Sequence, residues 1–208
     1  MSLLNHVTNI LTKPKQEWEV IKNEPMTTSQ IFTGYVAILA LIPAIANFIG
    51  LCFIGITIPG FIGISSFTFK FSITEGIIQA LVSYVMAFVG VYAAAYIINA
   101  LAKNFDSTPD LNNALKLVAF SYTPVWLAGI FSIYPMLGVL GIVGLYGLYL
   151  LYSGLEPMMN TPQPKKMVYL VVSIVVLIVV FIVVGIVVKI ATPTPSFESL
   201  MNQQQYNF

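Results

Sequence analysis

Five long apolar stretches constrain this chain more than any other feature of its sequence. A helix that spans a membrane needs about 20 mostly apolar residues, because each residue adds ~1.5 Å to its length. The only charged side chain inside the five stretches is Lys116, close to one end of the third. We therefore predict an all-α fold, that of a polytopic membrane protein with five transmembrane helices. The predicted spans run from Ile31 to Ile56, Gly76 to Ala102, Ala114 to Ile133, Met136 to Leu155 and Met167 to Val188.

The composition excludes a surface that faces water on all sides. Only 8% of the 208 residues are charged and 58% are hydrophobic, whereas soluble domains carry about a quarter of their residues as charge. All nine basic residues are lysines, and the formal net charge is +1. Arginine is the residue that grips phosphate groups with two parallel hydrogen bonds. We therefore expect the lipid bilayer as a partner and no binding of nucleic acid.

The lysines predict how the chain is oriented in the membrane. With five crossings, seven of the nine lie on the side of the N-terminus, and only Lys70 and Lys189 lie on the other. Lysine-rich segments stay in the cytoplasm, so we predict a cytoplasmic N-terminus and an external C-terminus. The seven are Lys13, Lys15, Lys22, Lys103, Lys116, Lys165 and Lys166.

One connection leaves the number of crossings open. The third and fourth spans are joined by the uncharged segment from Ser132 to Pro135. A re-entrant hairpin would place the outer ends of these spans on the same side as two full crossings would, so the lysine count does not separate the two arrangements. Lengths of about 20 residues favour two full crossings.

Three regions are expected: a cytoplasmic amphipathic segment (1–26), the five-helix domain (27–191) and a short polar tail (192–208). In the first region a second short helix, with Trp18, begins near Pro14. An amphipathic helix with a tryptophan before a span is typical of a helix lying in the membrane interface; a docking surface for a partner is the alternative. The apolar residues at helical spacing are Leu3, Leu4, Val7, Ile10 and Leu11.

In the loop after the first span, apolar and polar residues alternate with a period of two. Phe67, Phe69, Phe71 and Ile73 alternate with polar residues. A period of two predicts a short strand or an extended segment at the lipid surface.

Small residues predict where the spans contact one another. Lipid offers no hydrophobic reason for helices to associate, so close approach along small side chains is the main way they do. The first three spans carry small residues at alternating steps of three and four, whereas the fourth has glycines at every third position, a ladder that would wind around an α-helix. The candidate packing residues are Ala37, Ala44, Gly76, Ser83, Gly90, Gly138, Gly141, Gly144 and Gly147.

The fifth span has a different texture. Residues 171–190 repeat a four-residue unit of mostly β-branched side chains, in which Gly185 is the only small gap. We therefore predict that spans one to four form the packed core and that span five is a flank facing lipid.

The chain carries few groups that could perform chemistry. His6 is the only histidine, and we expect it to be solvated on the polar face of its helix. No histidine-based metal site or general-base pair can form, so we expect no enzyme activity, no metal and no cofactor. Uncharged polar residues inside the spans have two interpretations: hydrogen bonds between helices, or a narrow polar lining for a solute. The candidates are Asn47, Gln79, Ser83, Asn99 and Ser121.

Three stretches resemble a known family. They are Trp18 with Glu24-Pro25 and the span that follows, Ala119-Phe-Ser-Tyr-Thr-Pro-Val-Trp126, and the run from Gly144 to Leu155. With five spans, the chain resembles the Yip (Ypt-interacting protein) family, especially its bacterial branch. The resemblance implies a protein integral to the bacterial cytoplasmic (inner) membrane.

The resemblance implies less about partners. Eukaryotic Yip proteins associate with prenylated Rab-type GTPases and carry an Asp-Leu-Tyr-Gly-Pro motif in a longer N-terminal region. This chain lacks that motif, so GTPase binding is not supported.

Two functions remain from the sequence. The first is a non-enzymatic membrane module that organises the bilayer or partner proteins, by self-association or by binding another membrane protein. The second is a small channel or carrier for a neutral solute, lipid or ion. Its lining would be Asn47, Gln79, Ser83 and Ser121.

Overall fold

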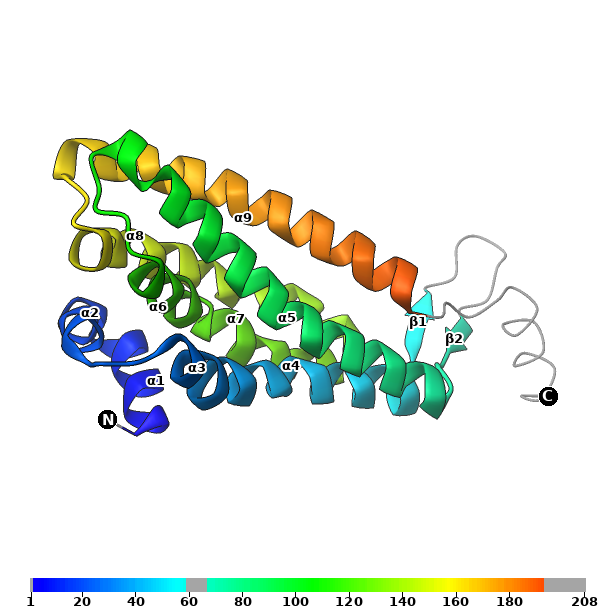
Figure 1. The fold of residues 1–208 in the computed structure, drawn as a ribbon. Helices are drawn as coiled ribbons and strands as arrows, with labels where there is room; N and C mark the ends of the chain where they lie inside the picture. The colour runs from blue at the N-terminus through cyan, green and yellow to red at the C-terminus, as the bar shows by residue number, and fades with distance from the viewer. Residues whose placement is uncertain (1, 59–66, 193–208) are drawn as a thin grey trace.

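The computed structural model describes residues 2–58 and 67–192. Within them, five helical segments are long and apolar enough to cross a membrane, and Figure 1 shows these segments running lengthwise beside one another. The predicted all-α fold with five spans is confirmed. The predicted polar tail lies, from residue 193 onward, outside the described residues. The segments are Thr28–Ile54, Ile73–Phe105, Leu111–Ile133, Pro135–Met159 and Gln163–Ala191.

Two short helices, α1 (Leu3–Thr12) and α2 (Pro14–Asn23), cover one end of the bundle (Figure 1). The backbone N–H of Asn5 donates to the Ser2 hydroxyl at the start of α1, and Pro14 occupies the first turn of α2, where a missing N–H costs nothing. The predicted amphipathic helices are present. The apolar face of α2 packs against the protein, however, and Trp18 is 0% exposed rather than placed in the lipid interface.

The first span is built from α3 (Thr28–Ile31), η1 (Phe32–Val36), α4 (Ala37–Ile49) and η2 (Gly50–Ile54). Thr27 and Gln30 form a capping box at its start, which satisfies two backbone donors that have no partner inside the helix. Gly55 ends the span with a φ of 88°, a conformation that favours glycine.

A two-stranded antiparallel sheet follows the first span. Strand β1 (Ile56–Ile58) pairs with β2 (Phe67–Phe69), and the hydroxyls of Thr57 and Thr68 lie 2.7 Å apart across the sheet. The strand predicted from the alternation at Phe67 is confirmed for β2. Residues 59–66 lie outside the described part of the chain.

The second span consists of α5 (Ile73–Leu101) and η3 (Ala102–Phe105), and it begins at a capping box between Ser72 and Glu75. The third consists of α6 (Leu111–Ser121), α7 (Thr123–Ala128) and η4 (Gly129–Ile133). Pro124 lies in the first turn of α7. Its missing N–H accounts for the break between α6 and α7.

The fourth span is the irregular one. Its first half, η5 (Pro135–Leu145), is a 3₁₀-helix, and its second half is α8 (Tyr146–Met159). A 3₁₀-helix has 3.0 residues per turn, so Gly138, Gly141 and Gly144 lie along one face. The expectation that these glycines wind around the helix was wrong, because it assumed 3.6 residues per turn. The fifth span is α9 (Gln163–Ala191).

The third span is the centre of the bundle. Most of it is buried, whereas the fourth and fifth spans are both largely exposed. Helix α6 packs between α5 and α8, and α9 packs against α5 and α8. The predicted division into a four-span core and a lipid-facing fifth span is therefore wrong for the fourth span, since η5 is as exposed as α9. A stripe on α9 is buried: Tyr169, Ser173, Leu177 and Val180.

The turn between the third and fourth spans reaches the far end of the bundle. A Cβ built on Gly50, at the end of the first span, would lie 2.2 Å from the Ser132 carbonyl oxygen. Strand β1 also packs against η5. Both spans therefore extend as far as the first, which is the arrangement of two full crossings.

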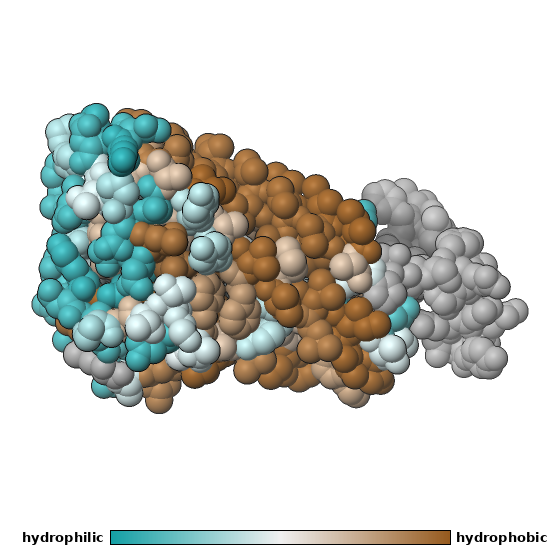
Figure 2. Space-filling view, viewed as in Figure 1, coloured by the Kyte–Doolittle hydropathy of each residue, from teal (hydrophilic) through white to brown (hydrophobic). Residues whose placement is uncertain are grey.

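Figure 2 shows hydrophilic residues gathered at the end of the molecule that carries α1 and α2, and apolar residues along the rest. The connections 106–110 and 160–162 lie at that end. The backbone N–H of Thr108 donates to the Met159 carbonyl oxygen at 2.8 Å, and the Lys165 ammonium lies 2.5 Å from an Asp106 carboxylate oxygen. The lysines predicted to share one side of the membrane therefore lie around a single polar end.

Candidate functional site

The polar residues predicted to line a solute path do not converge. Ser121 lines one cavity and Ser83 another, while Asn47 and Gln79 are half-buried and line neither of these. Within the described residues, the Asn99 Oδ1 and Ser121 Oγ atoms are buried without a hydrogen-bond partner. The hydrogen bonds between helices that the alternative interpretation requires are therefore not made by these two atoms.

The two cavities are adjacent and mostly apolar. The first, of about 350 Å³, lies between α6, α7, η5, α8 and α9, and three glycines of the fourth span line it: Gly141, Gly144 and Gly147. The second, of about 300 Å³, lies between α5, α7 and α9. Both are bordered by Tyr122 and Phe181, whose rings stack with centroids 5.7 Å apart. An aliphatic chain would suit such a lining better than a hydrated ion would.

The candidate packing residues of the first two spans lie where helices meet. A Cβ on Gly76 would lie 2.1 Å from the Cys52 sulfur, and one on Gly90 would contact Val184 of α9 at 3.5 Å. The Ala37 carbonyl oxygen accepts from the Tyr84 hydroxyl at 3.0 Å. Ala44 is buried on α4, and Ser83 is half-buried on α5.

The glycines of the fourth span fall into two groups. A Cβ on Gly147 would lie 2.5 Å from the Ser121 carbonyl oxygen, and one on Gly144 would lie 3.3 Å from Val125. These two glycines allow the fourth span to approach the third. A Cβ on Gly138 or Gly141 would meet nothing within 4 Å, so these two glycines face open space.

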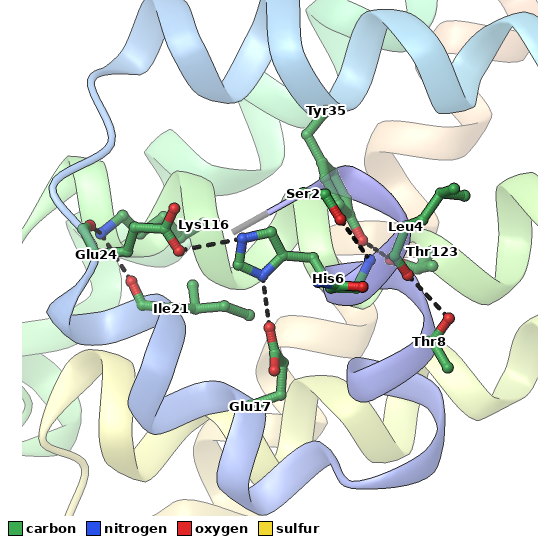
Figure 3. A network of polar contacts seen from close by, with 11 residues as sticks. Ser2, Leu4, His6, Thr8, Glu17, Ile21, Glu24, Tyr35, Lys116 and Thr123 are labelled. Carbon is green, nitrogen blue, oxygen red and sulfur yellow. Dashed lines mark hydrogen bonds and ion pairs between the residues drawn. The ribbon is translucent and has the colours of Figure 1, made fainter.

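The most developed polar cluster lies under the N-terminal helices (Figure 3). His6 of α1 points its Nδ1 at a Glu17 carboxylate oxygen, 2.5 Å away, and its Nε2 at a Glu24 carboxylate oxygen, 3.1 Å away. The exposed fractions are 4% for His6 and 2% for Glu17. The expectation that His6 is solvated was wrong. Its helical spacing from Leu3 and Ile10 was the signal that it shares their face.

Lys116 joins this cluster from the centre of the bundle. Its ammonium donates to the Ile21 carbonyl oxygen at 3.0 Å and to the Glu24 carbonyl oxygen at 2.7 Å, and its exposed fraction is 3%. The last carbonyls of a helix have no partner inside it, and a cation near them is favourable. Lys116 therefore closes the C-terminal end of α2.

The charge around Glu24 keeps its carboxyl group ionised. Burial raises the pKa of Glu24, but neighbouring positive charge, to which His6 and Lys116 contribute, brings the pKa below its ordinary value. A lowered pKa means that this stabilisation is fully present above the ordinary value of about 4.3. It is lost only as the pH falls further, through the lowered pKa.

Trp18 attaches α2 to the fourth span. Its indole N–H donates to the Ser153 hydroxyl at 3.0 Å, and its ring fills the space above Gly154. A Cβ on Gly154 would lie 2.7 Å from the Trp18 ring and 2.6 Å from Leu117. The absence of a side chain at this position creates the slot that holds the indole.

An aromatic group extends the cluster into the bundle. Phe120 of α6 meets the His6 ring edge to face at 5.5 Å and stacks on Tyr35 of the first span at 4.0 Å. The Tyr35 hydroxyl lies 2.6 Å from the Thr123 hydroxyl. In residues 2–58 and 67–192, no group of three or more His, Cys, Asp or Glu residues could hold a metal ion.

Most of the chain matches a known protein family. The sequence profile of the Yip1 domain matches residues 8–185. The chain belongs to the Yip1 domain family. The matched range contains Glu17, Glu24, Lys116 and the first four spans; it begins just after His6 and ends inside α9, the fifth span. The Yip resemblance drawn from the sequence is confirmed, and this Yip1-domain protein is an integral membrane protein.

Two curated relatives of the Yip1-domain chain are similar to it over part of its length. Both are named Inner membrane protein YohC, one from Escherichia coli strain K12 and one from Escherichia coli O6:H1. Each is 28% identical over 134 residues, which is 64% of this chain and 66% of the relative. The match therefore covers slightly less than two thirds of either relative. No solved structure matches the chain.

Proposed function

We propose that this Yip1-domain protein is a non-enzymatic module that organises the membrane by binding another membrane helix, from a second copy or another protein. The supporting observation is the segment Met136–Val143 of η5, in which every residue is exposed. Gly138 and Gly141 lie on one face of this segment with nothing within 4 Å of a built Cβ. Small residues let a second helix approach closely, which is how helices associate in lipid.

The irregular geometry of η5 also supports this role. Runs of 3₁₀-helix longer than three or four residues are uncommon, because their hydrogen bonds are poorer than those of an α-helix. Of the eleven residues of η5, the eight from Met136 to Val143 are exposed, so little packing compensates for the poorer hydrogen bonds there. A partner helix against Gly138 and Gly141 would supply it.

The replacement Gly141→Leu tests this surface. Leucine would keep a second helix away, and a loss of about 1–2 kcal/mol would lower the association constant about 5–30-fold. Cross-linking in native membranes, followed by identification of the product, measures the association. Gly185→Leu is the matched control, because a Cβ on Gly185 also meets nothing within 4 Å. Equal cross-linking of both variants and the parent would rule out this face.

The orientation and the cellular location belong to the same proposal. The polar end with most of the lysines would face the cytoplasm. The similarity to a relative named Inner membrane protein YohC supports a bacterial inner membrane. The C-terminal end of α9 would then lie outside.

The pair of apolar cavities favours a second candidate function, the binding or transfer of a lipid chain. Ser121 lines the first of these cavities and Ser83 the second, while Asn47 and Gln79 line neither, so these two cavities do not form the polar path expected for a solute or ion. Trp126 lines the second cavity and is only 4% exposed, so a lipid chain in that cavity would contact it.

Brominated acyl chains quench tryptophan on contact and can therefore report occupancy. In the Trp18→Phe variant, only Trp126 remains, and we expect its fluorescence to fall in vesicles of brominated phospholipid. The Trp126→Phe variant is the control, because Trp18 lies outside the spans and should keep its intensity. Equal intensity of Trp126 in brominated and ordinary lipid would exclude chain binding.

A further inference from the structure

His6 lies between two carboxylates, with one on each ring nitrogen. Each ring nitrogen faces a carboxylate oxygen, Nδ1 on Glu17 and Nε2 on Glu24. An ionised carboxylate only accepts hydrogen bonds, and a neutral imidazole can donate from only one nitrogen. Both contacts can be hydrogen bonds only when both nitrogens carry hydrogen. Between two ionised carboxylates, the geometry therefore suits an imidazolium, which donates from both ring nitrogens.

The groups that face His6 come from each element packed against it. Glu17 comes from α2, Glu24 from the residue that follows α2, and Lys116 and the Phe120 ring from α6. Glu24 is also held by its contact with Lys116 and by further interactions. Glu17 is different: it is 2% exposed, and its ion pair is with His6.

Loss of the His6 proton would break this arrangement at two points. One ring nitrogen would become an acceptor that faces a carboxylate oxygen, and the Glu17 carboxylate would stay buried beside an uncharged ring. Removing the partner of a buried charge is strongly destabilising. The simplest relief is for α1 to move away, so that water reaches Glu17.

We propose that α1 and α2 form a proton-dependent lid, held closed over α6 and α8 by the His6 imidazolium and opened when that proton is lost. Opening withdraws Trp18 from its slot at Gly154. It also frees the apolar faces of both helices, on which Ile10 and Ile21 are fully buried in the closed state. Free amphipathic helices with a tryptophan bind the membrane interface. The apolar faces of α1 and α2 would therefore contact the protein when the lid is closed and the lipid when it is open.

Trp18 is a reporter for the lid once Trp126, the other tryptophan, is replaced by phenylalanine. We expect this variant, in detergent micelles, to show a buried indole at about pH 6. Its emission should shift to the red and acrylamide quenching should rise by about pH 9.5, a range in which histidine loses its proton and lysine keeps its own. A Trp18 spectrum and quenching constant that stay unchanged over this range would overturn the proposal.

Two variants assign the transition to His6. His6→Gln cannot carry charge, so its lid should be open at both pH values, whereas His6→Lys keeps a cation and should stay closed at both. A closed lid in His6→Gln at about pH 6, or a parent-like pH transition in that variant, would also overturn the proposal. Far-ultraviolet circular dichroism of each sample separates lid opening from loss of the helical bundle. The pH titration of the Trp126→Phe protein itself needs no substitution in the cluster around His6.

Discussion

Replacing Gly154 by leucine is expected to expel Trp18 from its slot and to detach α2 from the bundle. A Cβ at this position would lie 2.7 Å from the indole and 2.6 Å from Leu117, both of which are fully buried. The loss of a buried tryptophan from a core costs about 3–5 kcal/mol. The thermal unfolding midpoint in mild detergent and the rate of proteolysis within 1–26 measure the effect: the midpoint should fall and cleavage should accelerate.

The control for this prediction is again Gly185→Leu, which introduces the same side chain into a helix where a built Cβ meets no neighbour. We expect its proteolysis to match that of the parent. If Gly154→Leu unfolds and is cleaved no faster than Gly185→Leu, the slot does not hold the N-terminal helices. The Trp18→Phe variant should fall between the two, because it keeps most of the ring but loses the hydrogen bond to Ser153.

The spans could be predicted because their signal is local. Length and hydropathy place a segment in lipid whatever its neighbours are. The Ser72–Glu75 capping box and the alternation at Phe67 are also short-range patterns, and they mark the start of α5 and the position of β2. The family resemblance drew on the same kind of short pattern, such as the run from Ala119 to Trp126.

The N-terminal cluster could not be predicted in the same way, because its contacts join distant parts of the chain. Trp18 and Ser153 are 135 positions apart, and Lys116 is 95 positions from Ile21. Helical spacing indicates which face of α1 and α2 is apolar, but lipid and protein can both cover such a face. Helical spacing places His6 on the covered face of α1, but nothing near it in sequence indicates that Glu17 and Glu24 face its ring there.

The glycine ladder shows a third case, in which the signal was present and was given the wrong period. A spacing of three is the repeat of a 3₁₀-helix, and Gly138, Gly141 and Gly144 follow it through η5. The assumption of 3.6 residues per turn, that of an α-helix, placed these glycines on different faces of the span. In the structure they share one face, of which Gly144 packs on Val125 and the other two are open.

Replacing Lys116 by methionine is the second change expected to have a large effect. Methionine keeps most of the side-chain volume but removes both hydrogen bonds to the last carbonyls of α2, on Ile21 and Glu24. A hydrogen bond from a charged group contributes about 1.5–3 kcal/mol, so the two together predict a loss of about 3 kcal/mol or more. Part of the positive charge that lowers the pKa of Glu24 is lost with them.

Lys103→Met is the matched control, because Lys103 lies at the same polar end of the molecule but is exposed. Unfolding in a detergent titration should shift strongly for Lys116→Met and hardly at all for Lys103→Met. The two variants change net charge equally, so a common effect of charge on the micelle cancels between them. An equal shift would mean that Lys116 acts only through its charge. A larger shift for Lys116→Met locates the effect at the C-terminal end of α2, because the buried ammonium of Lys116 donates the hydrogen bonds that water cannot supply to the carbonyls there.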